Sequence, residues 1–181
     1  LDTNVFDHLS SAGWRIKQVI DKRTTPWENP LLAHLTLNTL SSVEAVAIVD
    51  IPGPRLGLHG CAVLREYVRR GGTALFFGGA TTLNRGHYFT SPFADMLPVR
   101  RGNAAAALLR NDSGHGHTYS YNVVPTPDAG APPDRPTLIV GHYGEGTVIV
   151  CPWATLGTPS APYWLTESFA DKLNNIIKKQ R

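Results

Sequence analysis

The sequence is poor in cysteine, in charged residues and in long apolar runs. Among its 181 residues are two cysteines, Cys61 and Cys151, which stand far apart and form neither a CxxC pair nor a cysteine–histidine ligand spacing. Neither a disulfide framework nor a zinc site is therefore expected, and both residues are predicted to be reduced, buried thiols. No apolar run approaches the roughly 18 residues needed to span a bilayer, so we expect no membrane span in this chain.

Charge of either sign is also sparse. Charged residues make up 17% of the sequence, and the formal net charge is +3. The basic residues are scattered apart from Arg69-Arg70, Arg100-Arg101 and the terminal cluster Lys178–Arg181. Recognition of nucleic acid normally requires a clustered basic face, so no nucleic-acid partner is predicted.

The apolar residues that are present suffice for one core. Hydrophobic residues make up 42% of the sequence, and a chain of this length fits one domain, so we predict a single soluble domain over residues 1–181. Residue 1 is Leu1 rather than methionine, and no charged segment followed by an apolar one resembles a signal peptide. A cytoplasmic location, or a place within a larger protein, is expected.

Two apolar strands separated by a helix define the predicted fold class. Nearly continuous apolar residues are typical of parallel strands that are buried on both faces, and a Gly-Gly pair commonly follows the end of a helix. The expected elements are a strand at Ala45–Ile51, a loop at Pro52–Pro54, a helix at Leu58–Arg70 and a strand at Thr73–Phe77. A strand–helix–strand unit of this kind predicts an α/β fold, with a mostly parallel sheet covered by helices on both faces.

The other elements follow from apolar periodicity and from the positions of glycine and proline. Helices are predicted at Val5–Ala12, Leu31–Leu40, Pro92–Leu97 and Tyr163–Lys179. Strands are predicted at Trp14–Ile20 near a sheet edge, at Ala105–Arg110 and Thr118–Val124 within an irregular insertion, and at Pro136–Tyr143 and Thr147–Cys151 as a late hairpin.

A series of short motifs carries a family resemblance. In order, they are Leu64–Gly72 with its final Gly-Gly, Leu75–Gly79, Gly86-His-Tyr88, Ser91-Pro-Phe93, Met96-Leu-Pro-Val99 and the later Tyr143-Gly-Glu-Gly146. This combination resembles the class I glutamine amidotransferase-like superfamily, in the branch of the glutamine amidotransferase-like and ThuA-like families. The match covers about two thirds of the chain.

The resemblance implies a flavodoxin-like sheet that ends in a late antiparallel hairpin, Pro136–Val150. It also implies a first strand that precedes Leu1 and its helix, and no such strand is visible in the sequence. Either the sequence is truncated, or another chain or segment supplies that strand, or the strand has been lost. Each alternative favours a fragment, or a domain completed by a protein partner or by the rest of a longer chain, and leaves oligomerisation open.

The catalytic positions of the resembled family are empty. Catalytic members place a cysteine in the turn after the strand that ends here at Phe77, and a histidine and a glutamate later. This sequence has Gly78–Thr82 in that turn, and Pro152-Trp153 follows the strand that ends at Cys151, with no Pro-x-His-x-Glu. The resemblance therefore implies a domain without a Cys-His-Glu triad, and we predict no catalytic residues, no enzyme activity and no cofactor.

A ligand site is predicted at the carboxyl ends of the strands, where open α/β sheets bind their ligands. The exposed amides of the glycine turn suit a carboxylate or phosphate. The predicted ligand-binding residues are Asp50, Gly78, Gly79, Thr81, Thr82, Asn84, His87 and Trp153. The threonines alternatively cap a helix or bond within a turn, or one of them replaces the nucleophile with His87 as its base.

Three other groups of residues leave alternatives open. Cys151 at a strand end is either a buried structural thiol or a reactive one beside the pocket. His115 and His117 share one face if they lie on a strand and then suit a metal, but no third ligand is identifiable, so no metal is predicted. The aromatics Trp153, Tyr163 and Trp164 either pack on the core or stack on a sugar or partner.

These observations favour a non-catalytic amidotransferase-like module that serves assembly or ligand recognition within a larger protein or complex. The alternative is an enzyme of sugar metabolism or a glycoside-hydrolase accessory domain of the same fold. A third hypothesis is a metal-dependent hydrolase that uses His115 and His117. The expected ligand is a small molecule or a saccharide.

Overall fold

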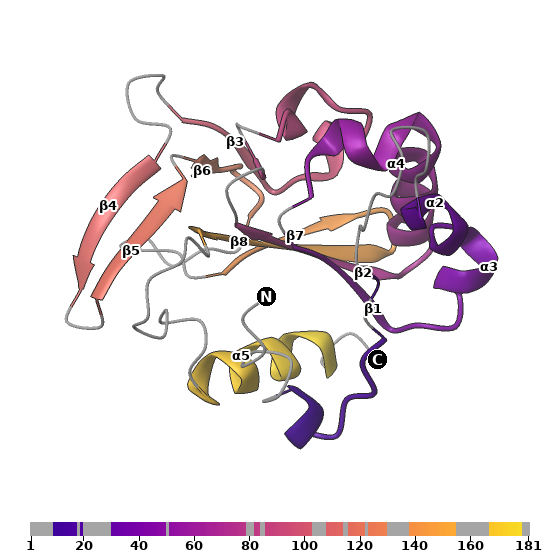
Figure 1. Cartoon of the computed structure of the whole chain (residues 1–181), viewed down its shortest axis with the longest axis horizontal. Coiled ribbons are helices and arrows are strands. Elements are labelled where there is room, and N and C mark those ends of the chain that lie inside the picture. The colour runs from indigo at the N-terminus through magenta and orange to yellow at the C-terminus, as the bar shows by residue number, and fades with distance from the viewer. Residues whose placement is uncertain are drawn as a thin grey trace.

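Helices cover both faces of a central sheet (Figure 1). The computed structural model describes residues 9–17, 19, 30–49, 51–78, 82–83, 86–102, 108–113, 116–121, 123–129, 138–154 and 167–178. Helices α2 (Pro30–His34), α3 (Leu37–Leu40) and α4 (Gly53–Arg69) lie above the sheet in this view, and α5 (Glu167–Lys178) lies below it. Within these residues, no helix is long and apolar enough to cross a membrane.

Three neighbouring strands of the sheet are parallel, as the sequence predicts. Strands β1 (Ala45–Val49), β2 (Thr73–Gly78) and β8 (Gly146–Ala154) pair in parallel, with Val49 opposite Phe77 and Phe77 opposite Cys151. Antiparallel strands extend the sheet, namely β7 (Ile139–Tyr143), β5 (Gly116–Tyr121) and β4 (Leu108–Ser113). The α/β class and the late hairpin are therefore confirmed.

A small second sheet joins β3 (Val99–Arg101) to β6 (Val123–Pro125) in antiparallel pairing. The predicted strand at Thr118–Val124 thus divides between β5 and β6, and β4 begins at Leu108, toward the end of the strand predicted at Ala105–Arg110. Residues 103–107 lie outside the described part of the chain.

Two apolar clusters account for the layers. Leu56, Leu64, Phe76 and Val150 belong to the larger cluster, between the sheet and α4. Leu75, Phe77, Ile149, Leu173 and Ile177 belong to the smaller one, between the sheet and α5. Alternate residues of β2 face opposite clusters, as expected for a strand buried on both faces.

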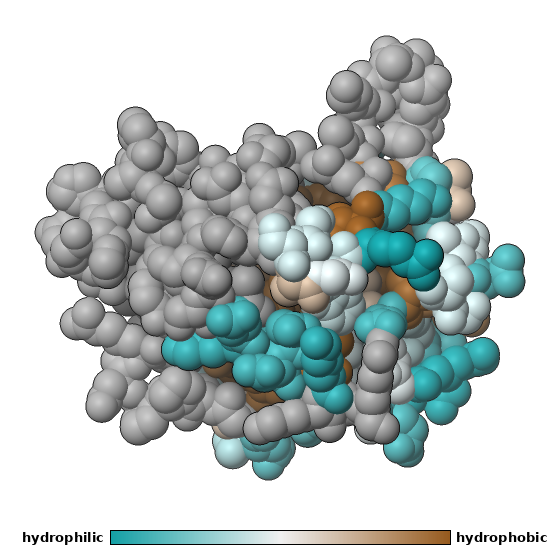
Figure 2. Space-filling view, turned by 90° about the horizontal axis from the view of Figure 1, so that it is seen from below, coloured by the Kyte–Doolittle hydropathy of each residue, from teal (hydrophilic) through white to brown (hydrophobic). Residues whose placement is uncertain are grey.

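Helix α5 is amphipathic. Leu173 and Ile177 are buried, whereas Asp171, Lys172 and Lys178 are exposed. Figure 2 shows this face from below, where hydrophilic residues dominate the described surface and hydrophobic ones appear in the gaps between them. The helix predicted at Tyr163–Lys179 is thus confirmed over Glu167–Lys178, with Leu173 and Ile177 on its buried face, while residues 163–166 lie outside the described residues.

The predicted edge strand at Trp14–Ile20 is wrong: residues 14–17 and 19 form no strand. Trp14 packs in the cluster below the sheet and donates its indole Nε1–H to Asn174 Oδ1 of α5 at 3.0 Å. Val19 packs in the cluster above the sheet. The described residues of this segment pair with no strand, and the indole of Trp14 is bonded to a helix instead.

The loop predicted at Pro52–Pro54 is also wrong, because helix α4 already begins at Gly53. The helical turn Gly53–Leu56 precedes a break at Gly57, whose φ of 65° and ψ of 174° are not helical. Such a positive φ suits glycine. The predicted start at Leu58 marks the point where the helix resumes after this break.

The helix predicted at Leu31–Leu40 is two short helices, α2 and α3. Thr36 is extended, with φ −124° and ψ 150°, and its hydroxyl accepts a hydrogen bond from the backbone N–H of Thr39 at 3.1 Å. An N-cap of this kind starts a new helix.

Two other predicted helices are shown in part. Of the helix predicted at Val5–Ala12, residues 9–11 are helical and 1–8 lie outside the described residues. The short helix predicted at Pro92–Leu97 is the 3₁₀ turn η2 (Ala94–Met96), and a second 3₁₀ turn, η1 (Tyr88–Thr90), precedes it.

Candidate functional site

The carboxyl ends of the three parallel strands meet at one edge of the sheet. Gly78 ends β2 opposite Ala154 of β8, although the preceding pair is Phe77 with Cys151. This change of register means that β8 has two more residues than β2 at this edge, as in a bulge. Bulges commonly re-aim side chains next to functional sites, and this is the edge where the sequence predicts a ligand.

The loop that follows β2 is tied to the end of β1. The backbone N–H of Gly53 donates to Gly86 O at 2.7 Å, and the Tyr88 hydroxyl donates to Ile51 O at 2.5 Å. Within the loop, Gly86 N donates to Thr82 O and Tyr88 N to Leu83 O, both at 3.1 Å. These bonds fix the loop against the first turn of α4.

Two residues of this loop adopt a left-handed backbone. Leu83 has φ 49° and His87 has φ 56°, a region that non-glycine residues rarely occupy. Leu83 is 1% exposed, and its carbonyl accepts the Tyr88 bond, so packing and hydrogen bonding hold the conformation. Such strain persists only where the surrounding structure imposes it.

The predicted ligand-binding residues divide into three groups. Asp50, Gly79, Thr81 and Asn84 lie outside the described residues. Gly78 and Trp153 lie in β2 and β8 at the predicted edge, and nothing is described of the Trp153 side chain.

Two of the predicted ligand residues lie in the described part of the loop after β2. Thr82 is fully buried, whereas His87 is exposed at the start of η1. The structure thus brings Gly78, Trp153, Thr82 and His87 to the carboxyl side of the sheet. His87 is the one among them whose described side chain faces solvent.

Both thiols are buried, as predicted. Cys61 of α4 is 0% exposed, and burial raises the pKa of its thiol to about 11. Cys151 is 2% exposed and packs in the cluster below the sheet. A thiol must ionise and reach its substrate to act as a nucleophile. Neither cysteine meets that requirement in this conformation.

Of the predicted histidine pair, His115 lies outside the described residues. His117 lies in β5, and His142 lies in β7 with its Nδ1 at 3.3 Å from Thr147 Oγ1. The described residues contain no group of three histidine, cysteine, aspartate or glutamate side chains that could hold a metal ion.

Two of the motifs that carry the family resemblance, Leu64–Gly72 and Tyr143–Gly146, meet at the carboxyl end of α4. The β7–β8 turn docks there, with Glu145 N donating to Arg69 O at 3.0 Å and Thr147 N donating to Gly72 O at 3.2 Å. A Cβ added at Gly146 would lie 2.0 Å from Val68 O, and one at Gly72 would lie 2.3 Å from the Tyr67 ring. These glycines permit close packing, so their role is structural.

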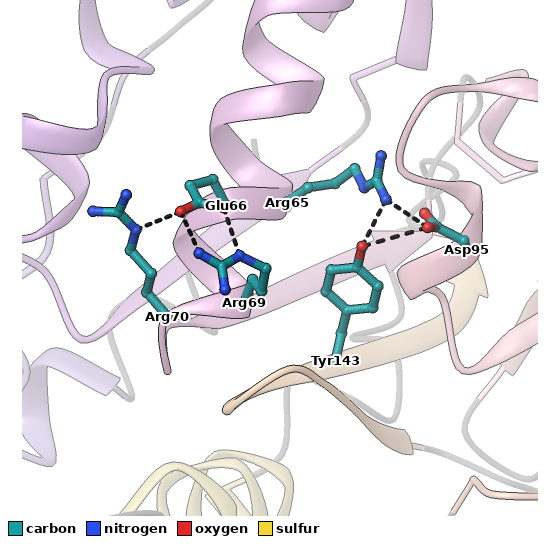
Figure 3. Close-up of polar contacts among 6 residues, drawn as sticks. All are labelled: Arg65, Glu66, Arg69, Arg70, Asp95 and Tyr143. Carbon is teal, nitrogen blue, oxygen red and sulfur yellow. Dashed lines mark hydrogen bonds and ion pairs between the residues drawn. The ribbon is translucent and has the colours of Figure 1, made fainter.

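A three-residue polar cluster joins the same elements on the outside (Figure 3). Arg65 Nη2 of α4 lies 2.6 Å from both Asp95 Oδ2 of η2 and the Tyr143 hydroxyl of β7. The Arg65 guanidinium also lies 5.6 Å from the centroid of the Tyr143 ring. The cluster connects α4, η2 and the late hairpin, and sequence spacing gives no hint of it.

Glu66 holds two arginines beside this junction (Figure 3). It accepts hydrogen bonds from Arg69 Nε at 2.7 Å and from Arg70 Nε at 2.5 Å. These bonds, that from Arg69 first, lower the pKa of Glu66 from 4.5 to about 2. Because the folded-state pKa is lowered, the stabilising contribution is present above the ordinary pKa and is lost as the pH falls toward 2.

We expect an NMR titration of the Glu66 carboxyl carbon to give a pKa near 2. In Arg69→Ala, the value should rise part of the way toward 4.5, because the largest cause of the shift is removed. Lys172→Ala removes a positive charge from another exposed helix and is the control. A Glu66 pKa that stays near 4.5 in the unmodified protein would contradict the ion-pair geometry.

An open cavity of about 360 Å³ lies at the opposite edge of the sheet, at the amino ends of β1 and β2. Tyr67, Val43 and Thr73 are among its walls, with Ile177 of α5. The Tyr67 hydroxyl donates to Val43 O at 3.2 Å and accepts from Thr73 N at 3.3 Å. The cavity is thus remote from the predicted ligand residues, and the tyrosine hydroxyl in its wall already has partners.

No family model and no curated protein matches the chain. The fold, however, is known. The cytoplasmic protein STM3548 from Salmonella typhimurium is 15% identical, with a TM-score of 0.72, over 98% of this chain and 85% of that one. The cytoplasmic protein STM1381 from Salmonella typhimurium LT2 gives the same TM-score and identity, over 98% of this chain and 86% of that one. At 15% identity the likeness shows the fold alone.

A weaker likeness involves a longer enzyme. The exo-β-1,4-mannosidase Op5Man5 from Opitutaceae bacterium strain TAV5 has a TM-score of 0.49 and 14% identity, covering 98% of this chain and 28% of that chain. A likeness of this strength carries no argument, so a role in sugar chemistry stays a prediction.

Proposed function

We propose that this chain is a non-catalytic member of the class I glutamine amidotransferase-like superfamily, with a flavodoxin-like sheet, that serves assembly or ligand recognition. In this proposal the chain acts within a larger protein or complex, in the cytoplasm. The observation that carries this proposal is the burial of both cysteine thiols. Cys61 is 0% exposed and Cys151 is 2% exposed, and the turn after β2 has no cysteine.

The arrangement of the retained motifs supports the same proposal. The glycines and the tyrosine of the resembled motifs pack the late hairpin against α4, which is a structural task. A chain that keeps the packing motifs but has no thiol at the nucleophile position lacks the cysteine nucleophile of the resembled family. Ligand recognition would then rest on the carboxyl edge, where His87 is exposed.

Labelling with a thiol-reactive glutamine analogue tests this proposal. We expect no adduct on the folded protein by intact-mass spectrometry, because both thiols are buried and the pKa of Cys61 is raised to about 11. The unfolded protein should label at both cysteines, which shows that the reagent is active. Ammonia release from glutamine should equal that of a buffer blank.

The single variants Cys61→Ala and Cys151→Ala assign any label to one thiol. A stoichiometric adduct on the folded protein that disappears in Cys151→Ala would contradict the proposal, as would glutamine hydrolysis above the blank.

A further inference from the structure

Strand β4 is the last strand of the main sheet and pairs with β5 alone among the described strands. In Figure 1 it forms the outermost edge of the molecule, on the side away from the helices. The outer edge of such a strand carries backbone N–H and C=O groups in the pattern that another strand can pair with.

Among the described residues, the β4–β5 hairpin has one short connection to the rest of the sheet. All six residues of β4 pair with β5, from Leu108 opposite Tyr121 to Ser113 opposite Gly116. In that part of the chain, Tyr119 and Ser120 of β5 pair with β8. A two-stranded ribbon is marginally stable in water and needs a third strand or other packing. A strand added to the outer edge of β4 would supply it.

The charged residues of β4 indicate which kind of strand could pair with its outer edge. Successive residues of a strand alternate between its faces, so Arg110 and Asp112 share one face and Asn111 stands between them on the other. A positive and a negative residue are therefore two positions apart on the same face. Charged residues usually protect an edge from pairing, unless the incoming strand carries the opposite charge at each position.

We propose that β4 pairs in an antiparallel manner with β4 of a second copy of this chain, about a two-fold axis at Asn111. A two-fold axis perpendicular to the sheet keeps each residue on its own face, so it must pass through a residue position. With the axis at Asn111, Arg110 of each copy stands opposite Asp112 of the other. The two main sheets then form one continuous sheet across the dimer.

A two-fold axis at either residue next to Asn111 would be unfavourable. An axis at Arg110 places two arginines opposite each other, and one at Asp112 places two aspartates opposite each other. Like charges directly opposite destabilise a strand pair, whereas opposite charges stabilise it. The charge pattern therefore selects both the partner and the register. This inference goes beyond the proposed function and holds whether or not a thiol is reactive.

The contact is small, because one strand contributes it, so we expect a weak dimer whose population depends on concentration. Sedimentation velocity of the full chain, from low micromolar to about 1 mM, should show a monomer–dimer equilibrium. Hydrogen exchange at the β4 amides should slow as the dimer forms. A protein that stays monomeric over this whole range overturns the proposal.

Charge reversal tests the register. The single variants Arg110→Asp and Asp112→Arg each place like charges opposite each other twice, so we expect the dimer to weaken about tenfold or more. The double variant Arg110→Asp/Asp112→Arg restores opposite charges and should dimerise within about threefold of the unmodified chain. Arg100→Asp makes the same charge change at an exposed residue of β3 and should leave the dimer unchanged.

Circular dichroism establishes that each variant is folded before association is measured. Single variants that dimerise as well as the unmodified chain overturn the proposal, and so does a folded double variant that stays as weak as the single ones. Failure here would leave the labelling result unaffected, so the two proposals are separable.

Discussion

Gly146→Ala is expected to destabilise the protein by roughly 4 kcal/mol or more, or to prevent it from accumulating in folded form. The added Cβ would lie 2.0 Å from Val68 O and 2.4 Å from Gly72 O. Val68 O is a backbone atom of the last turn of α4, and Gly72 O is a backbone atom between α4 and β2, so neither can move without shifting one of these elements. The hairpin would have to move away from α4 and lose the bond from Thr147 N to Gly72 O.

Urea unfolding of the full chain, followed by circular dichroism, measures this loss. Glu145→Ala is the matched control, because this neighbouring turn residue is exposed and should change stability by no more than about 0.5 kcal/mol. A Gly146→Ala variant as stable as Glu145→Ala would show that the hairpin does not dock on α4 as described.

Phe76→Ala is expected to cost about 3 to 5 kcal/mol. Phe76 is 1% exposed, and its ring lies 5.5 Å from that of Tyr88 and 5.4 Å from that of Phe93, between centroids. Tyr88 and Phe93 in turn lie 5.1 Å apart in an edge-to-face arrangement. Removing the Phe76 ring leaves a cavity under both 3₁₀ turns and removes two aromatic contacts.

The local consequence distinguishes this trio from ordinary core packing. Hydrogen exchange of residues 86–96 should accelerate in Phe76→Ala, because Phe76 is the β2 residue that these turns pack against. Phe77→Ala removes a ring of equal size from the opposite face and should leave residues 86–96 protected relative to the rest of the chain. Equal loss of protection in both variants would argue against a separate role for the trio.

Prediction from the sequence succeeds for elements whose structure is determined by their own residues. The apolar runs at 45–49 and 73–77 predict parallel strands, and both runs form them. Burial on both faces holds for β2, whereas Ile48 is the one buried residue of β1, because β1 lies at the edge of the sheet among the described strands. The absence of any ligand spacing around Cys61 and Cys151 correctly predicts buried thiols. Each of these inferences needs only a few neighbouring residues.

Prediction from the sequence fails where contacts between distant segments of the chain determine the structure. The alternation of Trp14–Ile20 looks like a strand, yet its described residues pair with no strand, and Trp14 bonds to Asn174, 160 residues later. The strained loop at Leu83 and His87, and the Arg65–Asp95–Tyr143 cluster, depend on segments far apart in the chain. No local pattern contains that information.

The cluster below the sheet has a consequence for how this chain folds as it is synthesised. Leu9 and Trp14 come from its beginning, Leu173 and Ile177 from its end, and Trp14 bonds to Asn174, 160 residues later. The apolar underside of β2 and β8 therefore stays uncovered until α5 has left the ribosome. Exposed apolar surface of this kind makes a nascent chain prone to aggregate, so a chain shortened before α5 should require a chaperone to stay in solution.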